Sequence, residues 1–266
     1  MNKRRQLEIS PNALAKRRFL SRAAGAGGAL LLGGCDRLNE SAEFGKLLST
    51  GEALSHGVHH LIAGRRGMAQ EFNAADLSPE FRGNGNTDPD SDEYKAMVEN
   101  KFTDWRLMVD GLVEQPASYS LAQLREMPSR TQITRHDCVE GWSAIGKWTG
   151  VPLARLLEAA KPKAAARFVV FHCADAFEEG DGEVPYYESI DLEDAYHPQT
   201  ILAYGLNDAA LPVMNGAPLR LRVERQLGYK QAKYLMRLEL VDSFAAMGGG
   251  KGGYWEDQGY QWYAGI

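Results

Sequence analysis

Cysteine is scarce in this chain of 266 residues, which contains only Cys35, Cys138 and Cys173. No Cys-x-x-Cys pair is present, and the adjacent His59 and His60 have no evident further ligand, so the sequence does not predict a zinc site. A Cys-x-x-Cys-His motif for covalent haem is also absent. Redox chemistry in this protein would therefore need an external electron-transfer partner.

An excess of positive charge is absent as well, because 30 basic residues face 35 acidic ones, for a net charge of −5. Without a strong basic field, nucleic acid is not expected as a partner. The glycine-rich stretch GGGKGG lacks the Gly-x4-Gly-Lys-Ser/Thr pattern that cradles phosphate, which argues against nucleotide hydrolysis. The aromatic residues near the C-terminus are expected to form a packed cap; they are Tyr254, Trp255, Tyr260, Trp262 and Tyr263.

Long apolar runs are missing too: AAGAGGALLL, near the N-terminus, is about half of the roughly 20 residues that a membrane-spanning helix needs. A basic stretch precedes it, and the two together are typical of an export signal, here over residues 1–35. KRRFL resembles the twin-arginine class of signals, with the usual spacing if Lys16 and Arg17 are the pair. LGGC resembles a lipobox, so Cys35 is expected either to carry a lipid anchor or to leave with the cleaved signal. The sequence thus predicts a periplasmic protein that the twin-arginine machinery exports.

Periodicity in the remainder predicts many short elements. One or two helices are expected between residues 40 and 72, followed by an irregular segment at 78–94 that is dense in Gly, Asn, Asp and Pro. Strands are expected at 105–113, 131–139, 167–175, 218–224 and 234–242, and helices at 120–127, 152–160 and 189–197. Ser120 is placed as an N-cap, and Pro152 at the start of its helix. Strands and short helices in irregular order indicate an α+β fold.

Cys138 lies in the stretch RHDCVEGWSAIGKW, beside a histidine, two acids and two tryptophans. In an oxidising compartment it would be able to form a disulfide with Cys173, in a protein that is a non-enzymatic binding module. As the nucleophile of a thiol enzyme it would need a base such as His136, but two side chains on one strand point in parallel and seldom meet head-on. His136 is therefore expected to be structural. A third interpretation makes Cys138 the ligand of a soft transition metal whose other ligands come from an organic cofactor.

From Cys138 onward the chain resembles the molybdopterin domain of the sulfite oxidase family, with its blocks in the family's order. CVEGWSAIGKWTGVPLARLLE resembles the block that supplies the cysteine ligand of molybdenum. The stretch 197–241 resembles the block that holds the pterin phosphate, and FRGNG at 81–85 resembles a pterin-contacting loop. The resemblance implies a mixed-sheet, sulfite-oxidase-type molybdopterin-binding fold over residues 76–266, after an N-terminal helical segment at 36–75. The family's immunoglobulin-like dimerisation domain has no counterpart here, so a single-domain monomer is expected.

The resemblance also implies a role for each matching residue. Cys138 would be the catalytic residue and the thiolate ligand of molybdenum, with two dithiolene sulfurs and oxo or hydroxo oxygens completing the coordination. Arg220 and Lys233 would supply the cations that a dianionic phosphate needs, helped by nearby backbone amides. By strand alternation, one of Arg220 and Arg222 is expected to be solvated. The residues implied to bind the molybdopterin are Phe81, Asn84, Gly85, Cys173, Asn215, Arg220, Gln231, Ala232 and Lys233.

The implied activity is molybdenum-cofactor-dependent oxygen-atom transfer on a small-molecule substrate. True sulfite oxidases have an arginine just before the loop asparagine and basic residues shortly after the ligand cysteine, where this chain has Gly83 and VEGWS. CVEGW is closer to the bacterial branch that includes a periplasmic methionine sulfoxide reductase catalytic subunit. Sulfoxide reduction is therefore expected, with sulfite-type oxidation as the alternative. The external partner would be a haem protein or cytochrome, of the kind found in membranes. Trp142 and Trp148 would either wall the pocket or belong to the core.

Overall fold

The computed structural model describes residues 67–179 and 182–266, together with 50–51, 54 and 57–58. The chain divides into two compact units, 1–57 and 58–266. The expected export signal at 1–35 lies outside the described residues, as does most of the expected helical segment at 40–72. Described residues between 50 and 58 are helical, whereas 67–72 are not, so the helical expectation is wrong at its C-terminal end. No helix among the described residues is both long and apolar enough to cross a membrane.

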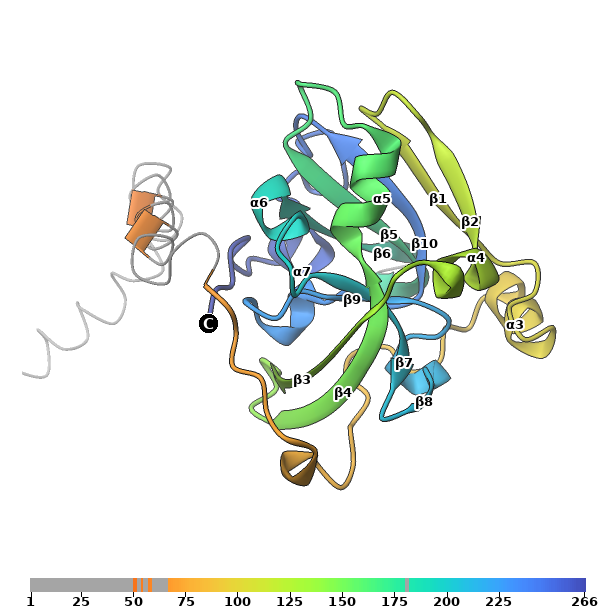
Figure 1. Ribbon diagram of the computed structural model, residues 1–266. Coiled ribbons are helices and arrows are strands. Elements are labelled where there is room, and N and C mark those ends of the chain that lie inside the picture. The colour runs from red at the N-terminus through yellow and green to blue at the C-terminus, as the bar shows by residue number, and fades with distance from the viewer. Residues whose placement is uncertain (1–49, 52–53, 55–56, 59–66, 180–181) are drawn as a thin grey trace, which may run out of the picture. The chain divides into compact units, whose positions relative to one another are not determined.

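The described part of residues 58–266 forms two β-sheets with short helices between the strands (Figure 1). The first sheet is mixed and has the order β2–β1–β10–β5–β6, in which only β1 and β10 are parallel neighbours. Its strands are β1 (Arg106–Gly111), β2 (Ala117–Ser120), β5 (Phe168–Glu179), β6 (Gly182–Asp191) and β10 (Leu235–Val241). The second sheet is antiparallel and has the order β3–β4–β7–β8, with β9 also paired to β7. Its strands are β3 (Arg130–Asp137), β4 (Ser143–Pro152), β7 (Ile201–Leu206), β8 (Ala209–Ala210) and β9 (Arg220–Arg222).

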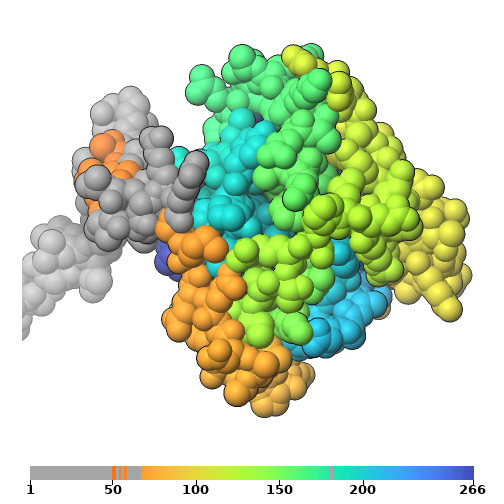
Figure 2. Space-filling view, in the orientation of Figure 1, coloured from red at the N-terminus to blue at the C-terminus, as the bar shows by residue number. Residues whose placement is uncertain are grey.

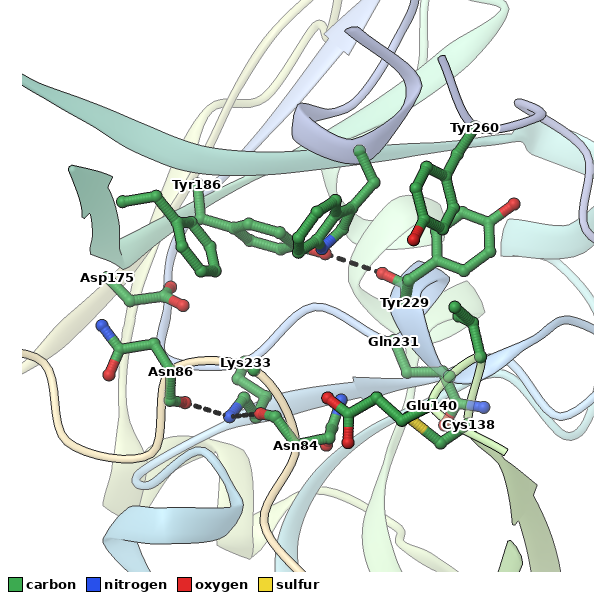
Figure 3. Close-up of a pocket in the computed structure, with 15 residues that line it drawn as sticks. Asn84, Asn86, Cys138, Glu140, Asp175, Tyr186, Tyr229, Gln231, Lys233 and Tyr260 are labelled. Atoms are coloured by element: carbon green, nitrogen blue, oxygen red, sulfur yellow. Dashed lines mark hydrogen bonds between the residues drawn. The ribbon is translucent and has the colours of Figure 1, made fainter. Parts of the chain in front are cut away.

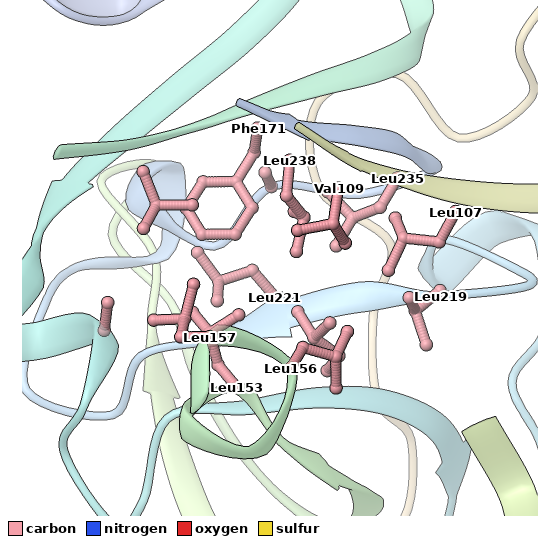
Figure 4. Packing of buried hydrophobic residues seen from close by; sticks show 14 of the residues in the cluster. Leu107, Val109, Leu153, Leu156, Leu157, Phe171, Leu219, Leu221, Leu235 and Leu238 are labelled. Carbon is pink, nitrogen blue, oxygen red and sulfur yellow. The ribbon is translucent and has the colours of Figure 1, made fainter. Parts of the chain in front are cut away.

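Helices are short and mostly connect strands. The α-helices are α3 (Asp92–Glu99), α4 (Leu121–Glu126), α5 (Leu153–Ala160), α6 (Leu192–Ala195) and α7 (Tyr254–Asp257), and the 3-10 helices are η1 (Ala74–Asp76), η2 (Val213–Asn215) and η3 (Gly228–Lys230). Helix α5 buries Leu153, Leu156, Leu157 and Ala160, the spacing of one helical face. It contacts β1 of the first sheet and β4 of the second. The main core thus forms around α5, where its leucines approach Phe171, Leu221 and Leu238 (Figure 4).

Several sequence expectations are confirmed in these elements. The mixed α+β fold is present. Strands β1, β9 and β10 fall within expected strands, and β3 and β5 overlap theirs. Ser120 caps α4, because its Oγ accepts from the N–H of Gln123 (3.1 Å) while the Gln123 side chain accepts from the N–H of Ser120 (2.8 Å). Pro152 is the N-cap of α5 and also the last residue of β4.

Other expectations are wrong, each for a local reason. The helix expected at 189–197 is only Leu192–Ala195, because Ser189 to Asp191 extend β6 and the Asp191 side chain caps the helix. The segment 78–94 is irregular only as far as Ser91, whose Oγ accepts from the N–H of Tyr94 (3.2 Å) and starts α3.

The described segment 67–80 runs along the second sheet. Phe72 donates its N–H to the Ile133 carbonyl of β3 (2.9 Å), and Ser78 to the Ile145 carbonyl of β4 (3.0 Å). Figure 2 shows this segment in orange against the green hairpin of β3 and β4. The segment therefore leads the chain along the sheet toward residues 81–86, which take part in the site described below.

Strand β4 was not expected, because glycines occupy its buried face. Gly146 and Gly150 alternate there with Ala144 and Trp148, which hides the apolar alternation that marks a strand. A Cβ at Gly150 would lie 2.2 Å from the Leu202 carbonyl oxygen of β7, so only glycine allows β7 to approach.

Replacing Gly150 by alanine is expected to lower the free energy of unfolding by about 1–3 kcal/mol, because the paired backbone must move. Gly182→Ala is the matched control, since Gly182 is also in a strand but no heavy atom of the described residues lies within 4 Å of the added Cβ. Its effect should stay within about 0.5 kcal/mol. Urea unfolding measures both variants, and equal losses would contradict the close approach of β7.

Candidate functional site

Cys138 follows β3 and opens the turn into β4. Its N–H donates to the carbonyl of Trp142 (2.9 Å), and its carbonyl accepts from the N–H of Gly141 (3.0 Å). Gly141 has φ +86, a left-handed conformation that glycine adopts without a Cβ penalty. The side chain of Cys138 is half-buried and, like that of Cys173, is a free thiol, so no disulfide joins the two. Burial raises the pKa of the Cys138 thiol, whereas a nucleophilic cysteine needs a lowered pKa.

A cavity opens beside Cys138 where six segments of the chain meet (Figure 3). These segments are the loop 84–86, the turn after β3, strands β5 and β6, the region of η3 and the region of α7. The lining residues are Asn84, Gly85, Asn86, Cys138, Val139, Glu140, Asp175, Phe177, Tyr186, Gly228, Tyr229, Gln231, Lys233, Trp255 and Tyr260. Five of the ten residues expected at the site line it: Asn84, Gly85, Cys138, Gln231 and Lys233.

Lys233 holds the loop 84–86 against the cavity. Its Nζ donates to the backbone carbonyls of Asn84 and Asn86. Burial, followed by the charge of Arg220, lowers the pKa of Lys233 to about 7. An anionic group in the cavity would restore the charged form, because an opposite charge favours it. Asn84 contributes a buried Oδ1 that has no hydrogen-bond partner among the described residues.

Arg220 lies behind the cavity wall rather than in it. Its guanidinium is fully buried and donates to the carbonyls of Asn215 (2.9 Å) and Gln231 (3.3 Å). Asn215 in turn donates to the carbonyl of Phe81 (3.4 Å), which ties the loop to η2. Arg220 Nε and Gln231 Oε1 are buried without a partner in the described part of the chain. Burial, and then the Arg222 charge, lowers the pKa of Arg220 to about 9.

Arg222 corrects the expectation that one of the two arginines is solvated, because both are completely buried. Arg222 makes two bonds to the Glu224 carboxylate (2.9 and 2.6 Å) and lies over the Trp148 ring at 4.3 Å from its centroid. Its Nη1 donates to His136 Nδ1 (3.0 Å). Burial and the nearby Arg222 charge hold the pKa of His136 well below its usual value, so the ring is neutral. His136 is thus structural, as expected.

The other expected residues support the wall. Phe81 packs edge-on against Trp148 with a centroid distance of 4.9 Å, and Ala232 is buried in the main core. Cys173 is partly buried on β5, outside the lining, and burial raises the pKa of its thiol well above the ordinary value. Neither tryptophan of the Cys138 stretch lines the cavity. Trp148 belongs to a smaller hydrophobic cluster with Phe81 and residues of β4 and β7, and Trp142 packs against that cluster. Whether these residues contact the cofactor stays a prediction.

Sequence reasoning missed much of the aromatic side of the cavity. Trp255 and Tyr260 belong to the expected terminal cap and do pack together, with centroids 5.3 Å apart, but they also line the cavity. Tyr186 of β6 donates its hydroxyl to the Tyr229 carbonyl (2.7 Å). The aromatic cluster itself was visible in the sequence, but its partners on β5 and β6 come from distant parts of the chain.

Metal binding at this site would depend on ligands from a cofactor. No group of three or more His, Cys, Asp and Glu side chains is placed to hold a metal ion among the residues that the structure describes. Cys138 supplies one sulfur at the cavity and Lys233 supplies a buried cation, with the charge of Arg220 behind the wall. Asn84 and Gln231 supply buried polar atoms that have no partner among the described residues. This donor set fits an anionic, polar organic group that carries its own metal ligands.

The comparisons with known proteins agree with that chemistry. A family model described as the oxidoreductase molybdopterin binding domain matches residues 94–246. A relative from Azospira oryzae, named putative protein-methionine-sulfoxide reductase subunit YedZ1, is 36% identical over 94% of this chain and 88% of its own length. The protein-methionine-sulfoxide reductase catalytic subunit MsrP of Ralstonia nicotianae is 37% identical over 52% of this chain and 44% of its own. The solved structure of the sulfane dehydrogenase SoxCD from Paracoccus pantotrophus has a TM-score of 0.47 at 26% identity, covering 53% of this chain and 39% of that one.

The family model and the relative from Azospira oryzae place the chain in the molybdopterin-dependent oxidoreductases of the sulfite oxidase family. The protein is an enzyme of that family and binds a molybdopterin cofactor. The family and cofactor expected from the sequence are thereby confirmed. A non-enzymatic binding module with a disulfide is ruled out by the family and by the two free thiols.

Proposed function

We propose that this protein is an exported reductase of sulfoxides that uses a molybdenum–molybdopterin cofactor, with Cys138 as the protein ligand of molybdenum. The observation that carries the proposal is the relative named as a putative protein-methionine-sulfoxide reductase subunit, which matches over 94% of this chain. Cys138 is the cysteine that lines the cavity, while Cys173 lies outside its lining. The thiol at the cavity is therefore the one that would bind the metal.

The cofactor, when bound, supplies two-electron oxygen-atom transfer. Reduction of a sulfoxide consumes two electrons and two protons and yields a thioether and water. This chain's residues hold and orient the cofactor: Lys233 would bind its phosphate from the cavity, and Arg220 would hold the Gln231 backbone behind it. Val139 and Glu140, next to Cys138, are exposed, so substrate would reach this end of the cavity from solvent.

Charge next to Cys138 favours a neutral substrate. Glu140 lines the cavity and is positioned by the indole N–H of Trp142, which donates to its carboxylate (2.9 Å). A carboxylate there repels an oxyanion such as sulfite, while a sulfoxide carries no net charge. Sulfite-type oxidation remains the second candidate, because the family includes that chemistry.

Export and electron supply complete the proposal. Residues 1–35 would direct the folded enzyme to the periplasm by the twin-arginine route, with Cys35 either lipid-modified or removed. Electrons would come from an external haem protein of the membrane, since the sequence has no Cys-x-x-Cys-His motif.

Assays on the purified holoenzyme separate the two candidates. With reduced viologen dye as electron donor, methionine sulfoxide should be turned over at rates typical of enzymes, about 1–10³ s⁻¹. With ferricyanide as acceptor, sulfite should give no turnover above the level without enzyme. Fast sulfite oxidation together with inert sulfoxide would overturn the proposal in favour of the alternative.

A further inference from the structure

A second cavity lies where α3, α4, β7 and β8 meet, and none of the roles described above uses it. Figure 1 shows these four elements near one another at the right of the view. The cavity has a volume of about 300 Å³, at the lower end of the range for small-molecule sites. It shares no lining residue with the cavity beside Cys138. A ligand bound here would therefore be distinct from the cofactor and the substrate.

The wall of this second cavity is mostly apolar. Leu121 of α4, Leu211 after β8 and Pro218 are buried, and they line it together with the partly exposed rings of Phe102 and Tyr204. An apolar chain placed against this wall would be removed from water together with the side chains that it covers, which favours binding.

Two cations at the cavity have no anionic partner. Lys101 follows α3, Arg125 is in the last turn of α4, and both are exposed. Neither forms an ion pair among the residues that the structure describes, although Arg125 lies over the Tyr204 ring, 5.7 Å from its centroid. No described Asp or Glu lines the cavity. Because the whole chain has a net charge of −5, this positive charge is a local feature, and it favours an anionic ligand.

Lys101 is held in a backbone conformation that lysine rarely adopts. Lys101 and Phe102 have φ +57 and +59, in the left-handed region that Gly and Asn occupy at lower cost. Their N–H groups donate to the carbonyls of Val98 (3.0 Å) and Met97 (2.6 Å), which fixes the turn. Packing of Phe102 on Tyr94, with ring centroids 5.9 Å apart, accounts for the aromatic residue. No hydrogen bond or ion pair of the Lys101 ammonium to a described residue accounts for the lysine, and such strain is concentrated at ligand sites.

We propose that this cavity binds a small amphipathic carboxylate, such as a fatty acid of medium chain length, with its chain against the apolar wall and its carboxylate between Lys101 and Arg125. A guanidinium can bind both carboxylate oxygens at once, and the ammonium adds a charge-assisted hydrogen bond. An alcohol with the same chain lacks the charge, and a short carboxylate lacks the apolar contact. The site depends neither on the cofactor nor on the reaction proposed above.

Calorimetric titration of the full-length holoenzyme with octanoate, 1-octanol, acetate and octylammonium tests which ligand features matter. Octanoate should bind at least about tenfold more tightly than octanol and acetate, because only octanoate has both the charge and the chain. Octylammonium should give no heat of binding, since it carries the same charge as the two side chains. Equal affinities for octanoate and octanol would overturn the proposal, as would equal affinities for octanoate and acetate.

Lys101→Asn separates binding from stability. Asparagine adopts the left-handed conformation more easily than lysine, so urea unfolding should show a variant at least as stable as wild type. The same variant should bind octanoate at least about tenfold more weakly, because one cation is lost. Lys161→Asn is the matched control, since Lys161 is also an exposed lysine with a positive φ (+53) but does not line the cavity.

Arg125→Gln removes the second cation and should also weaken octanoate binding at least about tenfold. Lys161→Asn should bind octanoate like wild type. Unchanged affinity in Lys101→Asn or in Arg125→Gln would overturn the proposal, and so would an equal loss of affinity in Lys161→Asn. Because binding is measured without turnover, these outcomes are independent of whether sulfoxide is the substrate.

Discussion

Cys138→Ala is expected to lower kcat for sulfoxide reduction by at least about 10³-fold, which corresponds to about 4 kcal/mol of lost transition-state stabilisation. Cys138 contributes the sulfur at the cavity, and no cluster of His, Cys, Asp and Glu side chains in the described ranges would replace it as a metal site. The metal would then be held by the cofactor alone. The measurement combines steady-state kinetics with molybdenum and pterin content per chain.

Cys173→Ala is the matched control, because it removes the other described thiol, which lies on β5 outside the cavity lining. This variant should keep more molybdenum and activity than Cys138→Ala, because the family resemblance implies a cofactor contact for Cys173 but not a bond to the metal. Cys138→Ala should also unfold within about 1 kcal/mol of wild type in the absence of cofactor, since its side chain is half-buried and sits in an exposed turn. If Cys173→Ala removed the activity and Cys138→Ala did not, the assignment of the ligand would be wrong.

Lys230→Met is expected to lower the free energy of unfolding by about 3–5 kcal/mol, the range for leaving a buried charge without its partner. Lys230 Nζ donates to the carboxylates of Glu188 on β6 and Glu256 in α7, and all three side chains are completely buried. Methionine has a stem of similar length but no charge. Removing the bond from Lys230 to Glu256 should also loosen the packing of α7, the helix that positions Trp255 at the cavity.

The pH dependence of that loss identifies its cause. Burial, and then the Glu256 charge, raises the pKa of Glu188 well above its ordinary value of 4.5. A carboxyl with a raised pKa binds its proton more tightly in the folded state, so its contribution is present below pH 4.5 and is lost as the pH rises through the folded pKa. The pKa of Lys230 is raised above 10.5 in the folded state, so the lysine contribution is lost only above that pH.

Lys230→Met should therefore lose more stability at pH 8 than at pH 5, where Glu188, with its raised pKa, protonates more easily. Adding Glu188→Gln to this variant should restore part of the loss, because one uncompensated carboxylate is removed. Lys251→Met changes an exposed lysine of the same C-terminal region and should stay within about 0.5 kcal/mol of wild type. Urea unfolding at the two pH values measures all three, and an identical loss at both would contradict an origin in the buried charges.

Local patterns predicted the elements that have strong local signals. Helix α5 has an apolar face at Leu153, Leu156 and Leu157, and α4 has the Ser120 capping box, so both were expected close to their actual bounds. Strands β4 and β7 were not predicted. Glycines occupy much of the buried face of β4, where β7 pairs closely with it, so β4 lacks the alternating large apolar side chains that mark a strand. The helix expected at 189–197 is shorter in the structure, because β6 continues through Ser189 by pairing with β5. This strand pairing outweighs the local preference of the segment for a helix.

The site shows the same division. Cys138, Lys233 and the loop with Asn84 were recognisable because each lies in a motif that is continuous in sequence. Asp175, Tyr186 and Trp255 were not, because they line the cavity only once β5, β6 and α7 have come together. Strand alternation alone predicted that one of Arg220 and Arg222 would be exposed to solvent. Both are buried, because both guanidinium groups lie over the Trp148 ring and Arg222 also bonds to the Glu224 carboxylate.

By itself, the sequence determined the class of this protein, a molybdopterin-dependent oxidoreductase with one candidate thiol ligand. The class was recognisable because the residues of each family motif are adjacent in the sequence. Tertiary structure alone decided that Cys138 and not Cys173 lines the cavity, that Trp255 and Tyr260 also line it, and that Asp175 lies at its far end. These features depend on contacts between strands and turns that are distant in the chain, and packing energy, not local periodicity, sets such contacts.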